Sequence, residues 1–418
     1  MDVDANGGNI SSLRISTVDE EDEEDEIQHD KVKDEVSEEE DEEEDGALVT
    51  LGFVEKPKTP WSLHRQYFPS KAGGTPAWLD PKNLPSGKSI HCDFCEEPLQ
   101  FVLQVYVPLG EESTFHRTLY LFMCPSMACL LRDQHEQWKR QPEIPSRSVK
   151  VFRCQLPRVN PFYSSVAPPE DGTAQPLMDG APLCDWCGTW KGDKLCGSCK
   201  RARYCSGKHQ AAHWRSSSSS HKISCQQVKT SDEEAASARF DNRQTAASNT
   251  LFPEYVIIDE DECEDDEEKS NDTGSSSSLI SRSHTDSSYG KWMSYFEGHN
   301  DNKSWASFQE RISRAPDQIL RLNCRDSSSG PAKPLWPVSS GRPSRLDIPK
   351  CSYCDSTRVF ELQVLPQLLY FFHVEDTEDS LDWATIVIYT CEASCHGGAA
   401  YIEEFAWVQL ASQSIPNQ

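Results

Sequence analysis

Alternation of apolar and polar positions predicts β-strands near both ends of the chain. Every second residue from Phe101 to Val107 is apolar, which places these side chains on one face of a strand. A second strand is expected at 118–123, and residues 350–410 return to the same strand character. The pattern therefore predicts a β-rich α+β fold.

Shorter patterns lie between these β-rich ends. The apolar run 251–258 could add one strand. Residues 304–313 predict a helix because their apolar side chains recur on one face. A second short helix is expected at 316–322, with proline in its first turn. Ordered structure is expected to begin near residue 48, where a short apolar run starts.

An internal repeat relates the two β-rich ends. The matching positions are Cys92, Cys95, Phe101 and Leu103–Val105 in one unit, and Cys351, Cys354, Phe360 and Leu362–Val364 in the other. Each unit then has a second strand that leads to another cysteine pair, Cys124 and Cys129 or Cys391 and Cys395. Two equivalent β units would pack most simply as one pseudo-symmetric split β domain, interrupted by an insertion.

Composition divides the chain into five parts. They are a disordered acidic tail (1–46), the N-terminal half of the split β domain (47–165), a Cys/His-rich block (184–225), a mostly disordered acidic and Ser-rich linker (226–290) and the C-terminal half of the split domain (291–410). The cysteine-rich block is the small insertion between the two β halves.

The net charge is concentrated in two tracts. The 418-residue chain has a formal net charge of −27, yet residues 19–45 hold 19 acidic residues and two lysines, and residues 259–268 hold nine acidic residues and no base. The remaining 40 acidic and 39 basic residues nearly cancel. No strong direct nucleic-acid binding is expected, because that would need a basic surface. The tracts are interpreted either as solvated disorder or as a mimic of RNA phosphate that covers a basic protein.

The 17 cysteines indicate metal rather than disulfides. Residues 1–4 lack the basic start and apolar run of a secretory signal, so an oxidising compartment is not expected. No apolar stretch approaches the ~20 residues that span a membrane. Clustered cysteines in a reducing compartment are typical of zinc sites.

Residues 184–225 contain eight candidate zinc ligands. In chain order they are Cys184, Cys187, Cys196, Cys199, Cys205, His209, His221 and Cys225. Eight ligands fill two tetrahedral sites and leave no open position for a catalytic water, so two structural zinc ions are expected. The hypothesis is interleaved pairing, with Cys184, Cys187, Cys205 and His209 on one ion; the spacing also allows sequential pairing. His213 is expected to be a surface helix residue and not a ligand.

The block resembles the MYND zinc finger. The resemblance rests on the Tyr204–Ser206 step, the His209-Gln210 pair, Trp214 and the closing His221-x3-Cys225. The sequence departs from the pattern at His209, where most such fingers have cysteine, and in the serine run 216–220, which lengthens a loop. The resemblance implies docking of proline-containing peptides, and the alternative is a finger that only braces its neighbours.

Two flanking clusters are weaker candidates for metal. Cys92, Cys95, Cys124 and Cys129 could form one zinc site, and Cys351, Cys354, Cys391 and Cys395 another. The alternative is that these are free thiols in a core. Cys154, Cys263 and Cys324 have no assigned role.

Most of residues 47–410 resembles the programmed cell death protein 2 family. The matching segments are Leu51–Phe53, Phe68–Leu79, Phe152–Arg158, Phe252–Glu254, Pro316–Arg321, Cys351–Cys354 and Phe360–Val364. The resemblance, to a plant-type member with an acidic N-terminal tail, implies a split β domain interrupted by a MYND finger. It also implies a ribosome-biogenesis role as the dedicated carrier of a newly made small-subunit ribosomal protein of the universal S-five family. The Gly73-Gly74 turn is interpreted either as a client-contacting loop or as a tight turn closed by Trp78.

Binding, and not catalysis, is the expected activity. The sequence has no glycine-rich phosphate loop, no HExxH motif and no nucleophile elbow, so no catalytic residue is assigned. The carrier hypothesis places binding on the split β domain, in the cytoplasm with a nuclear fraction and without membrane contact. The alternative is a nuclear adaptor that recruits transcription co-repressors, and it needs only residues 184–225.

Overall fold

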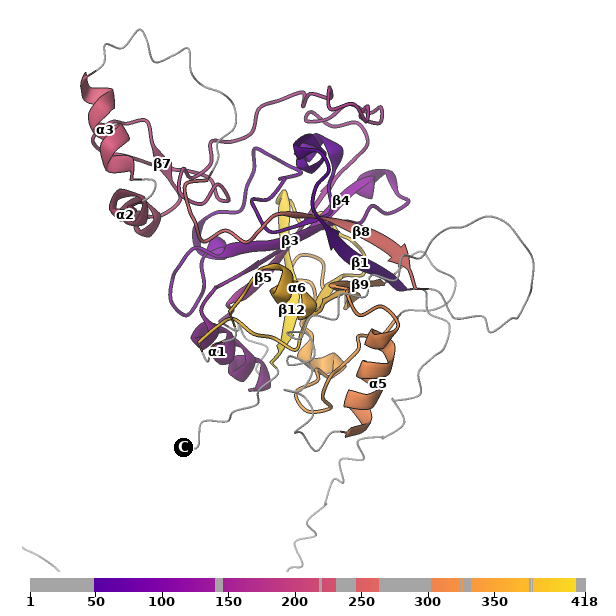
Figure 1. Ribbon diagram of the computed structural model, residues 1–418. Helices are drawn as coiled ribbons and strands as arrows, with labels where there is room; N and C mark the ends of the chain where they lie inside the picture. Colours follow the sequence, from indigo (N-terminus) through magenta and orange to yellow (C-terminus); the bar gives the residue numbers. More distant parts are fainter. Residues whose placement is uncertain are drawn as a thin grey trace, which may run out of the picture. The chain divides into compact units, whose positions relative to one another are not determined.

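The computed structural model describes residues 49–139, 146–217, 220–230, 246–262, 302–323, 325, 332–375, 377 and 379–410. Within these residues the dominant element is a closed antiparallel barrel (Figure 1). In order around the barrel, its strands are β1 (Val49–Glu55), β8 (Tyr255–Asp261), β2 (Lys71–Ala72), β3 (Gln100–Tyr106), β4 (His116–Met123), β5 (Val149–Leu156), β12 (Tyr401–Gln409), β11 (Thr385–Cys391), β10 (Arg358–Val364) and β9 (Leu320–Asn323), which pairs with β1. The prediction of a β-rich fold is confirmed.

Each half of the barrel is completed by a strand from the other half. Strands β1 to β5 come from the N-terminal part of the chain, and β8 to β12 come from the C-terminal part. In the barrel, however, β1 lies between β8 and β9, while β8 lies between β1 and β2. The first strand of each part is therefore exchanged, and the two parts pair along β1–β8, β1–β9, β2–β8 and β5–β12.

The hairpins β3–β4 and β10–β11 have an irregularity at matching positions. The register shifts between Phe101 and Leu103 in the first hairpin and between Phe360 and Leu362 in the second. A bulge adds one residue to a strand and reverses the alternation of side chains beyond it. Phe101 therefore packs in an aromatic cluster apart from the core that contains Leu103 and Val105. The expectation that Phe101 shares a face with these residues is wrong.

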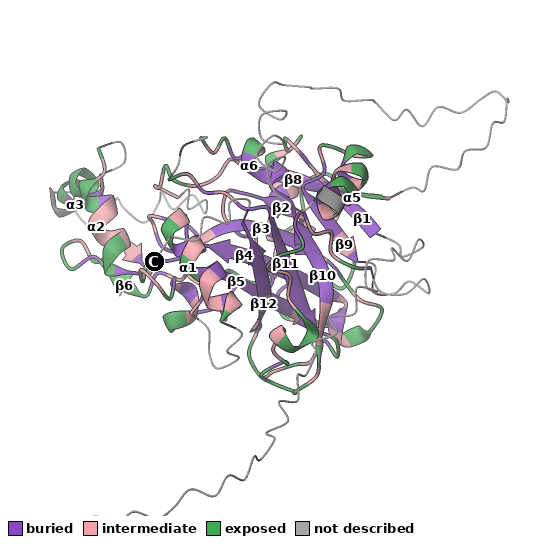
Figure 2. Cartoon of the chain, turned by 90° about the horizontal axis from the view of Figure 1, so that it is seen from below, coloured by how far each residue is buried: buried purple, intermediate pink, exposed green. Residues whose placement is uncertain are grey.

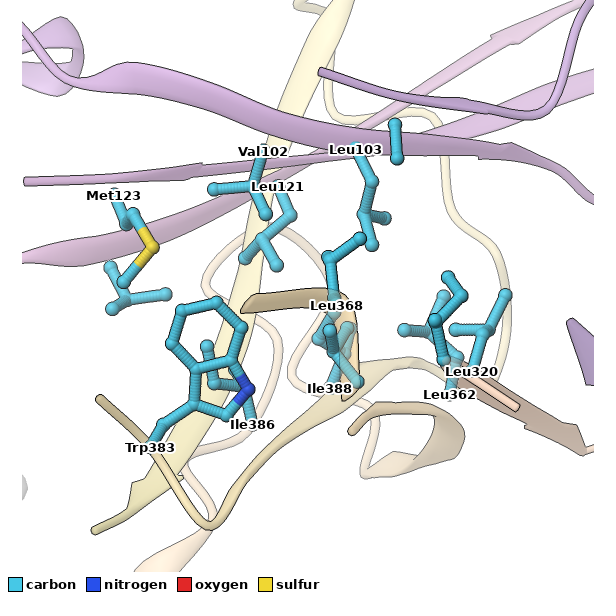
Figure 3. Close-up of a cluster of buried hydrophobic side chains, with 14 of the residues drawn as sticks. Val102, Leu103, Leu121, Met123, Leu320, Leu362, Leu368, Trp383, Ile386 and Ile388 are labelled. Atoms are coloured by element: carbon cyan, nitrogen blue, oxygen red, sulfur yellow. The ribbon is translucent and has the colours of Figure 1, made fainter. Parts of the chain in front are cut away.

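Apolar side chains from both halves fill one shared core (Figure 3). Val102 and Leu121 from the first half point toward Leu368 and Ile388 from the second. Helix α6 (Gln367–Phe371) supplies Leu368, and α1 (Met127–Trp138) adds Leu130 to the same cluster. Burial of this core stabilises the two halves only when they are together.

The remaining described elements lie outside the barrel. They are α2 (Gly207–Arg215), α3 (His221–Thr230), α5 (Asn302–Ser313) and a two-stranded sheet of β6 (Lys194–Leu195) and β7 (Arg203–Tyr204). Figure 2 shows buried residues along the barrel strands and exposed residues gathered on loops and on α3. Helix α5 confirms the helix expected at 304–313. The helix expected at 316–322 is wrong, because residues 320–323 form β9, where pairing with β1 and β10 outweighs local preference.

Part of the second acidic tract belongs to the barrel. Asp259–Asp261 lie in β8, the strand that the apolar run before them predicted. The next residue, Glu262, pairs with Arg321 at 2.7 Å and with Arg311 at 2.9 Å, and its backbone N–H donates to the carbonyl of Val49 at 2.8 Å. Opposite charge therefore fixes the start of this tract to the barrel edge where β1 begins.

The linker is described in part and the tail not at all. Tyr255–Asp261, within the linker that composition predicts to be mostly disordered, form β8 of the barrel, which completes the sheet between β1 and β2. Most of the remaining linker, 231–245 and 263–290, lies outside the described residues. The expected acidic tail 1–46 also lies outside them.

The Gly73-Gly74 turn packs against the segment that precedes β8. Both glycines have positive φ, +66° and +64°, which a side chain would strain. A Cβ on Gly73 would also lie 1.9 Å from the carbonyl oxygen of Pro253. Beside the turn, the buried ammonium of Lys71 pairs with Glu254. This packing supports the interpretation of the segment as a tight structural turn.

Candidate metal centres

Four groups of cysteine and histidine side chains converge in the described part of the chain. They are Cys92, Cys95, Cys124 and Cys129; Cys184, Cys187, Cys205 and His209; Cys196, Cys199, His221 and Cys225; and Cys351, Cys354, Cys391 and Cys395. Within each group the ligand atoms all lie within 4.8 Å of one another. Sulfurs bound to one zinc at about 2.3 Å in a tetrahedron are about 3.8 Å apart, so the groups are consistent with zinc binding.

The first finger group consists of Cys184, Cys187, Cys205 and His209. It joins the Cys184–Cys187 turn to the start of α2. Cys205 follows β7, and His209 lies in the first turn of α2, where the hydroxyl of Ser206 accepts a hydrogen bond from the His209 backbone N–H at 3.0 Å. His209 Nδ1 lies 3.2 Å from the sulfur of Cys205 and 3.8 Å from that of Cys184. The helix cap therefore aims the imidazole at the thiols.

The second finger group joins the turn after β6 to α3. His221 begins α3 and Cys225 follows one turn later on the same face. His221 Nε2 lies 3.4 Å from the sulfur of Cys199, and the sulfurs of Cys196 and Cys225 are 3.9 Å apart. The structure thus brings the eight finger residues together in the interleaved arrangement.

His213 is not a member of either finger group. It is buried, and its Nδ1 lies 3.1 Å from the hydroxyl of Tyr204. The expectation of a surface position for His213 is wrong, because the face of α2 that carries it packs on β7 and α3. The neighbouring Trp214 is instead 40% exposed.

The two flanking groups occupy matching places in the fold. Cys124 directly follows β4, and Cys391 is the last residue of β11. The Cys95 and Cys124 sulfurs are 3.6 Å apart in one group. In the other group, the Cys351–Cys395 and Cys354–Cys391 sulfur distances are 3.6 and 3.5 Å. Within each flanking group, the sulfur atoms therefore have the spacing of zinc-bound thiolates. They are too far apart to form disulfide bonds.

Local hydrogen bonds favour the thiolate form of two candidate ligands in the flanking groups. A hydrogen bond with Cys124 lowers the pKa of Cys92 to about 5. Hydrogen bonds from Ser356 lower the pKa of Cys354 to about 6. Thiolates are the form of cysteine that binds zinc, so the surroundings of Cys92 and Cys354 suit a metal. At His209, burial opposes the charged form, but hydrogen bonds with Cys184 and other thiols outweigh it and raise the pKa to about 9, so this imidazole has to give up a proton to bind zinc.

A buried tryptophan fixes the finger to the barrel. Trp190 lies three residues after Cys187, is fully buried, and contacts Phe122 at a ring-centroid distance of 4.4 Å. Its indole N–H donates to the carbonyl of Leu99 at 2.8 Å. Lys208 of α2 donates to the carbonyl of Cys95 at 2.9 Å. The finger therefore covers the flanking cluster of the N-terminal half.

Two aspects of the site were not predicted from the sequence. The role of Trp190 was missed, although a large apolar side chain inside a polar, metal-binding block is a usable signal for a buried contact. Cys154 lies on β5 away from all four groups, and burial raises the pKa of its thiol to about 12. Cys263 and Cys324 lie outside the described residues.

Comparison with family models separates the chain into three matched regions. Models for the N-terminal and C-terminal domains of "Programmed cell death protein 2" match residues 48–170 and 302–410. A model described as "MYND finger" matches residues 184–225. The two outer matches therefore lie on the two parts that build the barrel, and the third contains all eight finger ligands.

Individual proteins are similar over most of the chain. "Programmed cell death protein 2" of Bos taurus is 36% identical over 369 residues, which cover 86% of this chain and 95% of that protein. "Programmed cell death protein 2-like" of Homo sapiens is 27% identical over 364 residues, 81% of this chain and 89% of that protein. "Probable 20S rRNA accumulation protein 4" of Schizosaccharomyces pombe is 30% identical over 121 residues, 26% of each chain. No solved structure matches.

Membrane insertion through a helix finds no support in the described residues. None of their helices combines the length and the apolar character needed to cross a bilayer.

Proposed function

Because the chain belongs to the programmed cell death protein 2 family, we propose that it is a ribosome-biogenesis factor that carries a newly made small-subunit ribosomal protein of the universal S-five family. The observation that supports this most is the extent of the similarity, which spans both parts of the interlocked barrel and not the finger alone. The printed name of the fungal relative, which refers to 20S rRNA, supports a link to ribosomal RNA. The work of the protein in this proposal is binding, with no catalytic step.

The proposed cofactor is zinc in a structural role. Each finger group holds one ion through three thiolates and one imidazole, and each flanking group holds one ion through four thiolates. Such sites are complete without water and supply folding free energy instead of a reactive centre. Four ions per chain is therefore the expected loading.

The acidic tracts are proposed to speed capture of a basic client. The first tract ends at Asp45, shortly before β1, and the second continues from Glu262, whose backbone is hydrogen-bonded to Val49. The two tracts are therefore both close in sequence to the residues where β1 begins or to a residue hydrogen-bonded to them. Their charge attracts an unassembled ribosomal protein and repels rRNA, which suits a carrier in the cytoplasm with a nuclear fraction.

A second candidate function is a nuclear adaptor that recruits transcription co-repressors through proline-containing peptides. The observation in its favour is that Trp214 on α2 and Ile223 on α3 are 40% and 63% exposed. Exposed aromatic and apolar side chains suit peptide docking. Against it, Trp190 ties the finger to the barrel, as expected of a brace.

Affinity purification with mass spectrometry distinguishes the two functions. The full chain is compared with the double variant Trp214→Ala, Ile223→Ser and with Leu346→Ser, a matched control at a 93% exposed position outside the finger. We expect all three proteins to recover a small-subunit ribosomal protein equally well. The adaptor function would be established if the full chain recovered co-repressors that only the double variant loses. If no ribosomal protein were recovered at any salt concentration, the carrier function would be wrong.

A further inference from the structure

One end of the barrel gathers more positive than negative charge on buried and half-buried side chains. The residues are Arg117, Arg153, Arg325, Arg358, Glu361 and Glu404. Arg117 forms a forked pair with Glu361, and Arg153 pairs with Glu404 at 2.7 Å, all four side chains being almost completely buried.

The other two arginines share the same carboxylates. Arg325 lies 3.6 Å from Glu361, and Arg358 lies 3.0 Å from Glu404. Among the described residues, four guanidinium groups therefore share the two carboxylates of Glu361 and Glu404, and Arg358 also interacts with the nearby Glu403. Positive charge exceeds negative charge in these ion pairs. Such a surplus is costly in a buried place unless other negative charge lies close by.

The network is hydrogen-bonded to the turn that carries two of the cysteines. Arg325 Nη2 donates to the carbonyl of Glu392 at 2.7 Å, and Arg325 Nη1 donates to the hydroxyl of Ser394 at 3.2 Å. Arg153 Nη2 donates to the carbonyl of Cys395 at 3.2 Å. The backbone N–H of Cys391 donates to Glu404 at 3.1 Å. The surplus charge thus lies directly beside the Cys351, Cys354, Cys391 and Cys395 group.

We propose that this group binds Zn²⁺ as a tetrathiolate whose net charge of minus two complements the positive charge of this network, with Arg325 and Arg153 as its positioning residues. This inference rests on the zinc loading proposed above. Neutral thiols would add no negative charge beside this network.

The flanking group of the N-terminal half lacks this arrangement. There Lys150 pairs with Asp93 at 2.9 Å, and Arg147 pairs with Asp133 at 2.9 Å, so each of these cations has its own carboxylate. Charge coupling is therefore expected at the Cys351 group and not at the Cys92 group.

The test measures the rate of zinc release from the full-length protein with a chromogenic chelator. Arg325→Gln removes the charge, Arg325→Lys keeps it, and Arg321→Gln is the matched control, because Arg321 is a buried barrel arginine that pairs with Glu262 instead. Arg325→Met serves as a second charge-removing variant if the glutamine variant does not fold. Cys354→Ser identifies the ion in question, since its total zinc should fall from four to three per chain.

We expect Arg325→Gln to release one zinc about 10–100-fold faster than the wild type, the range typical of lost ligand-supporting contacts. Arg325→Lys and Arg321→Gln should release it at close to the wild-type rate. Unchanged zinc content in Cys354→Ser would overturn the metal site itself. Equal release from Arg325→Gln and Arg321→Gln would overturn the role of Arg325, and equal release from Arg325→Gln and Arg325→Lys would overturn charge as its cause.

Discussion

The two flanking cysteine groups share a scaffold but differ in what surrounds them. Each is built from two cysteines before a hairpin with the same bulge and two cysteines at or after the end of its second strand. The Cys92 group is covered by apolar side chains and by the finger, whereas the Cys351 group leaves Cys354 exposed and lies beside buried arginines. The same arrangement of four cysteines is therefore surrounded by apolar side chains in the first half and by arginine side chains in the second.

Separating the halves should have the largest effect, the loss of folding. In a fragment of residues 47–165, β1 has neither of its partners, β8 and β9, and a fragment of residues 291–410 has neither β1 nor β8. We expect each fragment alone to be insoluble or molten, because neither can close the shared core. Circular dichroism during thermal unfolding checks this, and a sharp cooperative transition from 47–165 alone would contradict the exchange of strands.

Removing one equivalent cysteine from each flanking group should lower the stability of the protein by different amounts. Cys391→Ser is expected to cost on the order of 5–10 kcal/mol, because it forfeits zinc and leaves buried arginines uncompensated. Cys124→Ser should cost clearly less, since it loses zinc alone. The measurements are zinc content and chemical denaturation of the full chain. Equal losses of stability would show that buried charge does not contribute to the difference.

Truncating the tryptophan that fixes the finger should affect only the first half. Trp190→Ala removes a fully buried side chain between the finger and Phe122, at an expected cost of about 3–5 kcal/mol. Zinc release from the Cys92 group should accelerate, while release from the Cys351 group should not change. Trp214→Ala on the exposed face of the finger is the control. Faster release from both groups would mean that the halves are not independent at their metal sites.

A pH effect of about 2–3 kcal/mol is expected from His116 in the first half. His116 lies eight residues before Cys124, and its side chain is buried. Burial, and to a smaller extent the positive charge of Arg158, lowers its pKa to about 4. The position eight residues before Cys391 is Trp383, which does not titrate. A depressed pKa means that the unfolded chain binds the proton first, so stability is full above about pH 6.5 and is lost as the pH falls toward 4.

The variant His116→Phe should flatten this dependence. The check is the free energy of unfolding of the full chain between pH 7 and pH 4, with His373→Asn at an exposed position as the control. A slope unchanged in His116→Phe would assign the acid sensitivity to other groups.

The convergence of the candidate zinc ligands was predictable from the sequence because metal geometry imposes short, regular spacings. The pairs Cys184–Cys187 and Cys351–Cys354 each lie in one tight turn, so their convergence needs little knowledge of the fold. Similar reasoning identified the repeat that contains Cys92 and Cys351, since a cysteine turn and a hairpin are each formed by residues close together in the sequence. The prediction that these groups hold zinc remains to be tested by metal analysis.

What the sequence did not reveal depends on contacts between distant segments. The outward position of Phe101 follows from a bulge that is visible only when β3 is paired with β4. The strand at Leu320–Asn323 exists because β1 and β10 flank it, although its sequence resembles a helix start. The arginine network joins residues more than 200 positions apart, such as Arg117 and Glu361, and no local pattern indicates it.

The exchange of first strands has a consequence for the order of events during synthesis. Strand β1 leaves the ribosome first, yet its partners β8 and β9 begin at residues 255 and 320. At 5–20 residues per second, β1 waits roughly 10–50 s as an unpaired, mostly apolar edge. The acidic tract that ends at Asp45 lies four residues before it and places strong negative charge beside that edge throughout the wait. Charge in this position is typical of a gatekeeper against self-association, so we expect the tract to protect the growing chain until its partner strands have been made.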